Sequence, residues 1–356
     1  MKFGETFTEY LHGEQERFLN KCSHVEYKRL KKVLKSCRVC RALENQSSSE
    51  HAEGEESNEL SEFCRCNSCP SPSKHTINTG NEMEVDLLTI PPLFSMFFAE
   101  LTREATEIAG CFSSRVRRLL HLHVSSGVQR CMWRLRHCFA DDQQVMIQEG
   151  RMLLDYVTMN AIAISKILKK YDKIHGSVSG RDFKTKLRAK RIELLQSPWL
   201  IELGAFYLNF SDSDSGEPAE FFRKFSCDLN DTQPAMTMSI SDSVKYEYSL
   251  TCAICLDTVF NPYALSCGHL FCKGCACSAS SVLLFQGLKA APRSAKCPVC
   301  RAVGVYNDAV QMTELDLLLR NRCNDYWKER LRAERAEMVK QSKEYWESQA
   351  ILTMGL

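Results

Sequence analysis

Eight cysteine and histidine residues near the carboxyl end have the types and spacing of metal ligands. Three of the four close pairs have two residues between their members, and the fourth has one. Such pairs let one tight turn aim two ligands at the same ion, and thiolate and imidazole are the donors that tetrahedral Zn²⁺ binds. The pattern predicts two zinc sites, built from Cys252, Cys255, Cys267, His269, Cys272, Cys275, Cys297 and Cys300.

The order of these ligands, three cysteines, one histidine and four cysteines, resembles that of the RING finger. The resemblance implies interleaved sites, with Cys252, Cys255, Cys272 and Cys275 on one ion and Cys267, His269, Cys297 and Cys300 on the other. Spacing alone leaves a linear zinc ribbon or a PHD-like module as alternatives, although the single histidine in fourth place matches the RING order. A segment this short cannot bury enough apolar surface to fold alone, so we expect the metal to supply its stability.

Residues between the ligands are candidates for contacting a partner. RING fingers bind a ubiquitin-conjugating enzyme that carries a ubiquitin thioester, and they favour its attack by a substrate lysine. By this resemblance Ile254 and Pro298 match the two contact positions, and Arg301 matches the linchpin, whose fork of donors can bridge enzyme and ubiquitin. Each residue also has a purely structural interpretation. Ile254 could only fill the zinc-binding turn, Pro298 could only stiffen a turn, and Arg301 could be a solvated charge. We expect Leu283–Phe285 to form the apolar side of a short helix that completes the groove.

Composition and length restrict the class of protein. A chain of 356 residues predicts two or three domains, and its net charge of +2 confines any polyanion site to a local patch. The 19 cysteines lack the pattern of a disulfide scaffold, which favours a reducing cytoplasm or nucleus. The longest apolar stretch, Leu87–Leu101, is interrupted by Pro91 and Pro92, so we expect that the protein is not integral to a membrane.

Apolar periodicity predicts a mainly α fold. Helices are expected over residues 1–40, 87–135 and 143–171 and after Gly180, and no long strand pattern precedes the zinc module. We therefore predict an N-terminal helical bundle followed by a small α+β zinc module and a C-terminal helix. The boundaries are a bundle over 1–208 with a polar loop at 41–82, a linker over 209–248, the zinc module over 249–304 and the helix over 313–350.

A run of lysines predicts an anion site in the helical region. Lys166, Lys169, Lys170 and Lys173 fall within an arc of roughly 100° on one helix face, where like charges repel one another. Tyr27 and Lys31 lie one turn apart and could add a hydroxyl and a further cation. A solvated basic face is the structural alternative, and nucleic acid is a second, although only Tyr171 and Phe183 offer aromatic stacking nearby.

The opening Met-Lys-Phe-Gly-x-x-Phe, the basic segment 24–35, the lysine run and the polar loop together resemble the SPX domain over residues 1–208. SPX domains bind inositol polyphosphates and pyrophosphates. The resemblance places the phosphate-binding residues at Tyr27, Lys31, Lys166, Lys169, Lys170 and Lys173.

With an SPX-like domain followed by a RING-like module, the chain resembles the plant family of nitrogen-limitation-adaptation and benzoic-acid-hypersensitive ubiquitin ligases. The resemblance implies a RING-type ubiquitin-protein ligase in phosphate and nitrogen signalling. It also implies nutrient transporters as one class of substrate, recruited at the plasma membrane. A non-catalytic phosphate-sensing adaptor is the alternative.

Two features leave alternatives open. Cys37, Cys40, Cys64, Cys66 and Cys69 have a spacing that permits a further metal site, but free thiols are the default. The charged C-terminal helix carries an irregular apolar stripe, which could pack on the zinc module or form a seam with a partner or a second copy.

Overall fold

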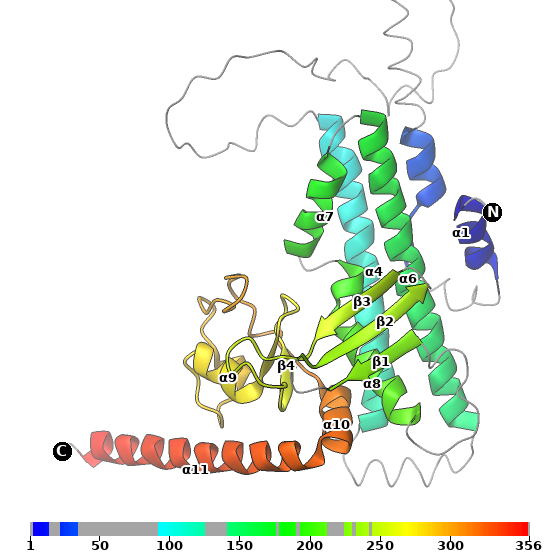
Figure 1. The fold of residues 1–356 in the computed structure, drawn as a ribbon. Coiled ribbons are helices and arrows are strands. Elements are labelled where there is room, and N and C mark those ends of the chain that lie inside the picture. The colour runs from blue at the N-terminus through cyan, green and yellow to red at the C-terminus, as the bar shows by residue number, and fades with distance from the viewer. Residues whose placement is uncertain are drawn as a thin grey trace, which may run out of the picture. The chain divides into compact units, whose positions relative to one another are not determined.

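The computed structural model describes residues 3–13, 22–34, 92–124, 141–175, 178–189, 193–211, 224–229, 233–241 and 244–354. The chain forms two compact units, Met1–Ile108 with Met159–Leu187, and Ala109–Thr158 with Arg188–Leu356. The fold is mainly helical, as predicted (Figure 1). Within the described ranges, no helix combines the length and apolar character needed to cross a membrane.

The first unit is helical. It contains α1 (Phe3–His12), a helix at residues 27–34, the N-terminal part of α4 (Pro92–Val124), the C-terminal part of α6 (Asp141–His175) and most of α7 (Ser179–Ala189). The ring of Phe98 stacks on that of Phe183 at 4.6 Å between centroids, which packs α4 against α7. Asp172 accepts hydrogen bonds from the backbone N–H groups of Gly180 and Arg181, and so caps the first turn of α7.

The second unit contains a sheet that the sequence did not predict. After η1 (Leu194–Gln196) and α8 (Pro198–Ser211), the strands β1 (Phe225–Asp228), β2 (Ala235–Ser241) and β3 (Val244–Ser249) pair antiparallel in that order. They occupy the segment that we expected to be a plain linker over 209–248. Met236 and Met238 alternate toward the core and are fully buried, and Gly204 of α8 lies against Phe225 and Met236. Packing against α8 therefore orders this segment. Its serines and threonines made the alternation of buried and exposed residues hard to recognise in the sequence.

The rest of this unit carries the predicted zinc module. β4 (Pro262–Ala264) pairs antiparallel with β5 (Leu270–Cys272) and β6 (Val310–Gln311), and α9 (Lys273–Ala279) and η3 (Leu288–Ala290) complete the module. The predicted helix over 313–350 is two helices, α10 (Thr313–Arg322) and α11 (Asn324–Met354). They are separated at Cys323, where the backbone leaves the helical conformation.

A buried carboxyl group joins α8 to α10. Glu202 is 1% exposed, and its two carboxyl oxygens accept hydrogen bonds from Glu314 N at 3.0 Å and Leu315 N at 3.1 Å. These donors belong to the first turn of α10, so Glu202 caps a helix distant from it in sequence. Asn209 Nδ2 donates to the backbone oxygen of Glu314 at 3.0 Å. Burial raises the pKa of Glu202 from 4.5 to about 8, although hydrogen bonding from Glu314 N opposes the shift.

Candidate functional site

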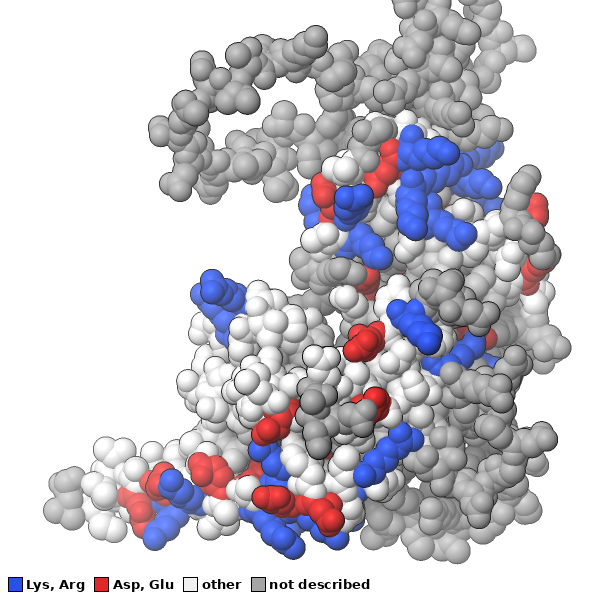
Figure 2. Space-filling view, in the orientation of Figure 1, with Lys and Arg blue, Asp and Glu red and all other residues white. Residues whose placement is uncertain are grey.

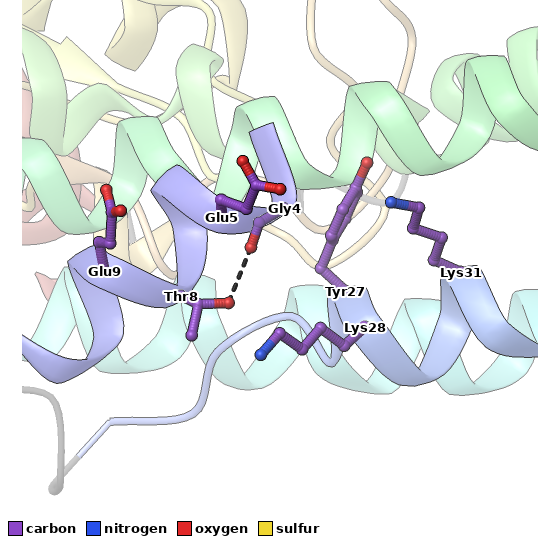
Figure 3. Close-up of a pocket in the computed structure, with 7 residues that line it drawn as sticks. All are labelled: Gly4, Glu5, Thr8, Glu9, Tyr27, Lys28 and Lys31. Atoms are coloured by element: carbon purple, nitrogen blue, oxygen red, sulfur yellow. Dashed lines mark hydrogen bonds between the residues drawn. The ribbon is translucent and has the colours of Figure 1, made fainter. Parts of the chain in front are cut away.

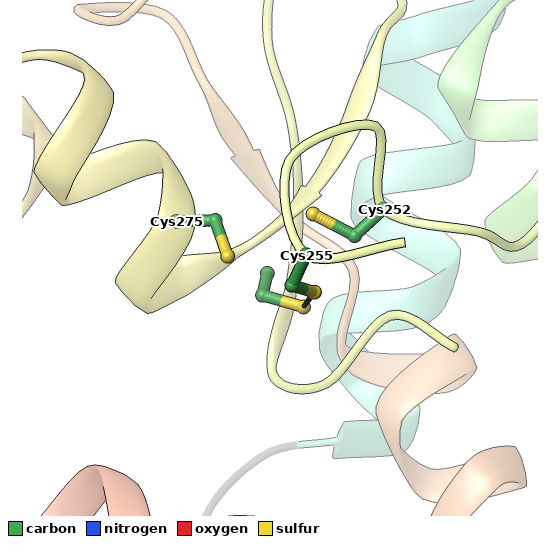
Figure 4. A group of neighbouring side chains, drawn as sticks. Cys252, Cys255 and Cys275 are labelled. Carbon is green, nitrogen blue, oxygen red and sulfur yellow. Dashed lines mark hydrogen bonds between the residues drawn. The ribbon is translucent and has the colours of Figure 1, made fainter. Parts of the chain in front are cut away.

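The first candidate metal centre is formed by four cysteines. The sulfur atoms of Cys252, Cys255, Cys272 and Cys275 all lie within 4.8 Å of one another. Cys272 ends β5 and Cys275 lies on α9, while Cys252 and Cys255 come from the loop before β4. Figure 4 shows the labelled side chains Cys252, Cys255 and Cys275 directed toward a shared space. Four thiol groups at this separation fit a tetrahedral Zn²⁺ site.

The second candidate centre combines three cysteines with the histidine. His269 Nδ1 lies 3.4 Å from Cys267 Sγ and 3.6 Å from Cys297 Sγ. Cys300 completes the group, whose donor atoms also lie within 4.8 Å of one another. Burial lowers the pKa of His269, which favours the neutral imidazole that metals bind. The structure thus brings together the two interleaved groups that the RING order implies, and each could hold a metal ion.

The predicted partner-binding residues lie on the surface of the module. Ile254 is 40% exposed, and Pro298 and Arg301 are exposed as well. Arg301 has a positive φ of 59°, and its N–H donates to Cys297 O at 2.9 Å, so the metal-binding loop holds its backbone. Leu256 and Val299, which the sequence analysis missed, are 75% and 49% exposed. Leu256 directly follows the first ligand pair and Val299 lies inside the last, so these positions could have identified them.

The prediction of a short helix at Leu283–Phe285 is wrong. These residues form a turn between α9 and η3, with Leu284 buried and Phe285 38% exposed. The helix ends earlier, at Ala279, and Val282 N bonds back to Cys277 O at 2.9 Å. Apolar side chains in this turn pack without the helical spacing that we expected.

A pocket in the first unit contains two of the predicted anion-binding residues. It has a volume of about 410 Å³ and is lined by Gly4, Glu5, Thr8, Glu9, Tyr27, Lys28 and Lys31. Figure 3 shows the hydroxyl of Tyr27 and the ammonium of Lys31 at one end of the pocket, with Lys28 directed to another side. Burial raises the pKa of Tyr27, so its hydroxyl remains a hydrogen-bond donor.

The ring of Phe3 connects this pocket to the lysine run. Lys166 Nζ lies 4.7 Å from the centre of the Phe3 ring. The rings of Phe3 and Tyr27 form a T-shaped contact with 5.2 Å between their centroids. A Cβ atom on Gly4 would lie 3.7 Å from Lys31 Nζ, so the start of α1 passes close to both cations. Tyr27, Lys31 and Lys166 are therefore gathered around α1.

The other predicted lysines lie outside the pocket lining. Lys169 and Lys173 are exposed and Lys170 is half-buried. Figure 2 shows Lys and Arg side chains gathered where Figure 1 draws the C-terminal end of α6, α7 and the helix at residues 27–34, so the exposed lysines of α6 belong to a basic surface. The five cysteines considered for a further metal site, Cys37, Cys40, Cys64, Cys66 and Cys69, lie outside the described residues.

Comparisons with known proteins identify the family. The family profile described as RING-type zinc-finger matches residues 252–298. The probable E3 ubiquitin-protein ligase BAH1-like 1 of Oryza sativa subsp. japonica is 63% identical over 361 residues, which cover 100% of both chains. The probable E3 ubiquitin-protein ligase BAH1-like of Arabidopsis thaliana is 56% identical, and the E3 ubiquitin-protein ligase NLA of the same plant is 40% identical, each over 100% of both chains. No solved structure matches the chain. The chain therefore belongs to the plant family of BAH1-like and NLA RING-type E3 ubiquitin-protein ligases.

Proposed function

We propose that this chain binds a ubiquitin-conjugating enzyme loaded with ubiquitin and promotes transfer of the ubiquitin to a substrate lysine. The observation that carries the proposal is the exposure of Ile254, Pro298 and Arg301 beside two interleaved groups of metal ligands. The apolar side chains provide a docking face for the conjugating enzyme. In the reaction the lysine amine attacks the thioester carbonyl and the enzyme's thiolate leaves, so the RING itself forms no covalent bond.

The two groups of ligands would each hold one Zn²⁺. Cys252, Cys255, Cys272 and Cys275 would bind the first, and Cys267, His269, Cys297 and Cys300 the second. The ions would supply cross-links between loops and take no part in the chemistry, since they hold the surface residues in place. Arg301 would reach acceptors on both the enzyme and ubiquitin and restrict the thioester to a reactive arrangement.

A reconstituted ubiquitination assay tests this function. The zinc-loaded full chain is incubated with activating enzyme, a panel of conjugating enzymes, ubiquitin and ATP, and we expect ubiquitin conjugates with at least one of them. Arg301→Ala should lose this activity, whereas Arg293→Ala, a change at another exposed arginine of the module, should retain it. A protein that carries both metals and forms no conjugates with any conjugating enzyme would favour the non-catalytic adaptor.

We also propose that the first unit is an SPX domain whose pocket binds an inositol polyphosphate or pyrophosphate. The support is the gathering of Tyr27, Lys31 and Lys166 around α1, with the basic surface of α6 beside them. Ammonium groups suit a ligand whose phosphate oxygens point in many directions. Glu5 and Glu9 also line the pocket and would oppose an anion, so they are expected to limit its affinity.

Calorimetry with inositol hexakisphosphate tests the pocket. Lys31→Ala and Lys166→Ala should each weaken binding, and Glu9→Gln should strengthen it, because a charge that repels phosphate is removed. Lys245→Ala, on β3 of the second unit, is the control and should leave affinity unchanged. Binding that survives the combined loss of Lys31 and Lys166 would place the ligand elsewhere.

The family resemblance supports a proposal for the substrates and the location. We propose nutrient transporters as one class of substrate. We also propose that this protein is located in the cytoplasm or nucleus and is recruited to the plasma membrane by its substrate. Recovery of ubiquitinated transporters that depends on Arg301 tests this proposal.

We also propose that the exposed end of α11, with Trp346 63% and Leu352 74% exposed, forms a seam with a second copy. Light scattering of the wild type and of Trp346→Ser tests this proposal. We expect the wild type to form a dimer and the substitution to weaken it. A monomeric wild type at high concentration would contradict it.

A further inference from the structure

One arginine outside the predicted metal-binding module reaches its first group of ligands. Arg330 lies on α11, beyond the last ligand, Cys300, and beyond the residues matched by the RING profile. Its Nη2 lies 3.9 Å from Cys272 Sγ and 4.0 Å from Cys255 Sγ. Its Nη1 lies 3.4 Å from Asp257 Oδ2. The guanidinium therefore faces two sulfur atoms and one carboxylate at the edge of the centre.

Contacts on either side of Arg330 hold α11 against the module. Trp327 Nε1 donates to Asp316 Oδ1 at 3.0 Å, and its ring packs on Phe260 at 5.8 Å between centroids. One turn beyond Arg330, Glu334 Oε1 accepts a hydrogen bond from Asn261 Nδ2 at 2.9 Å. These contacts before and after Arg330 hold its backbone beside the first group of ligands.

The charge of the two centres differs, and Arg330 lies at the more negative one. Four thiolates around a divalent ion leave an excess of two negative charges, whereas three thiolates and a neutral imidazole leave one. Cys252 and Cys272 are buried, so water does little to compensate this excess at the first centre. Cys272 Sγ accepts a hydrogen bond from Phe260 N at 3.3 Å. The guanidinium adds charged N–H donors toward the same sulfur and toward Cys255.

We propose that Arg330 is a positioning residue of the metal centre formed by Cys252, Cys255, Cys272 and Cys275. It stabilises the metal-bound thiolates by N–H to sulfur hydrogen bonds and by its positive charge. Outer partners of metal ligands commonly change metal affinity by about 10- to 100-fold. The functional module then extends from the cysteine and histidine motif into α11, and α11 serves the first centre selectively. The inference rests on the proposed zinc occupancy.

Asp257 provides a competing explanation that can be separated experimentally. Arg330 could act only as the partner of this carboxylate, an ion pair between side chains 31% and 53% exposed. Such exposed pairs contribute little to stability. If Arg330 acted only through this ion pair, Asp257→Asn would change zinc release as much as removing the arginine does. Under our proposal Asp257→Asn retains the metal, because the guanidinium still faces the sulfur atoms.

The experiment measures zinc transfer from the full chain to a chromogenic chelator, with cadmium-113 NMR of the cadmium-substituted protein to assign the two centres. A four-sulfur centre and a three-sulfur, one-nitrogen centre give separate resonances. We expect Arg330→Met to release one ion roughly 10 to 100 times faster and to shift only the four-sulfur resonance. Arg330→Lys, which keeps the charge without the fork, should lie between Arg330→Met and the wild type. Arg332→Met, at an exposed position of the same helix, should match the wild type.

Release within about twofold of the wild type in Arg330→Met, or equal acceleration of both ions, would overturn the proposal. So would an Asp257→Asn variant that matches Arg330→Met. If Arg330→Met fails to fold, Arg330→Lys decides: selective acceleration of the four-sulfur centre supports the proposal, and wild-type or unselective release refutes it. A wild-type chain purified without zinc would instead refute the zinc occupancy itself, which separates the two failures.

Discussion

Removing the carboxyl group of Glu202 should loosen the start of α10. Glu202→Ala leaves the N–H groups of Glu314 and Leu315 without the acceptors that they have in the structure, and both residues are 0% exposed. A buried donor without an acceptor costs about 1–3 kcal/mol. Two such donors predict a loss of about 2–6 kcal/mol in the free energy of unfolding, because both lie in the buried interior.

The assay combines thermal unfolding with hydrogen exchange of the zinc-loaded chain. For a unit of this size, a loss of about 2–6 kcal/mol lowers Tm on the order of 10 °C. Amide exchange should accelerate in the first turn of α10. Glu202→Gln should cost less, since it resembles the protonated acid, and Glu247→Gln, an exposed change on β3, is the control.

The pH dependence of stability provides a second, signed test of the same site. Burial raises the pKa of Glu202 to about 8 in the folded state, while the unfolded value is near 4.5. Between these values the folded chain keeps a proton that the unfolded chain releases, so stability present below pH 4.5 is lost as pH rises through 8. The slope is about −1.4 kcal/mol per pH unit, or about 2 kcal/mol between pH 6.5 and 8.

Glu202→Gln lacks this titration, so wild type should lose stability relative to Glu202→Gln over that range of pH. A Tm of Glu202→Ala within about 1 °C of the wild type would refute the capping role. Unchanged exchange in α10 would do the same, and parallel pH profiles of wild type and Glu202→Gln would refute the raised pKa.

Three further perturbations test the packing. Trp327→Ala removes the ring contact with Phe260 and should cost about 2–3 kcal/mol, with faster amide exchange along α11; unchanged exchange would contradict the docking of α11. Gly204→Ala places a methyl group 2.7 Å from Phe225 Cδ1, which should force α8 from the sheet and cost about 1–3 kcal/mol in thermal unfolding. Chelation should unfold residues 252–300 while the helical circular dichroism of α4 and α6 persists, and a module that keeps its amide protection without metal would contradict its dependence on the ions.

The two groups of candidate metal ligands could be predicted because their information is local. A spacing of one or two residues already restricts two donors to one ion, and the order of residue types then indicates how the pairs interleave. The grouping of Cys252 with Cys272 needed the family resemblance, since spacing alone also allows a linear arrangement. Tyr27 and Lys31 were predictable as neighbours because one helical turn separates them.

Features that depend on tertiary contact were missed. β1–β3 are short and rich in serine and threonine, and their buried face exists only because α8 covers it. Glu202 had a usable signal, because a single acid in the apolar segment Pro198–Phe210 requires a partner. Arg330 had none, since it is one of several arginines on a charged helix and only the fold brings it to Cys272.

The most direct test of the account is the single-turnover discharge of ubiquitin from a loaded conjugating enzyme to free lysine, measured with the zinc-bound chain and with Arg301→Ala. We predict that the wild-type chain accelerates discharge and that Arg301→Ala, with both metals retained, loses roughly tenfold or more of this acceleration. Equal discharge with and without the wild-type chain, or an Arg301→Ala variant as active as the wild type, would contradict the proposed ligase mechanism.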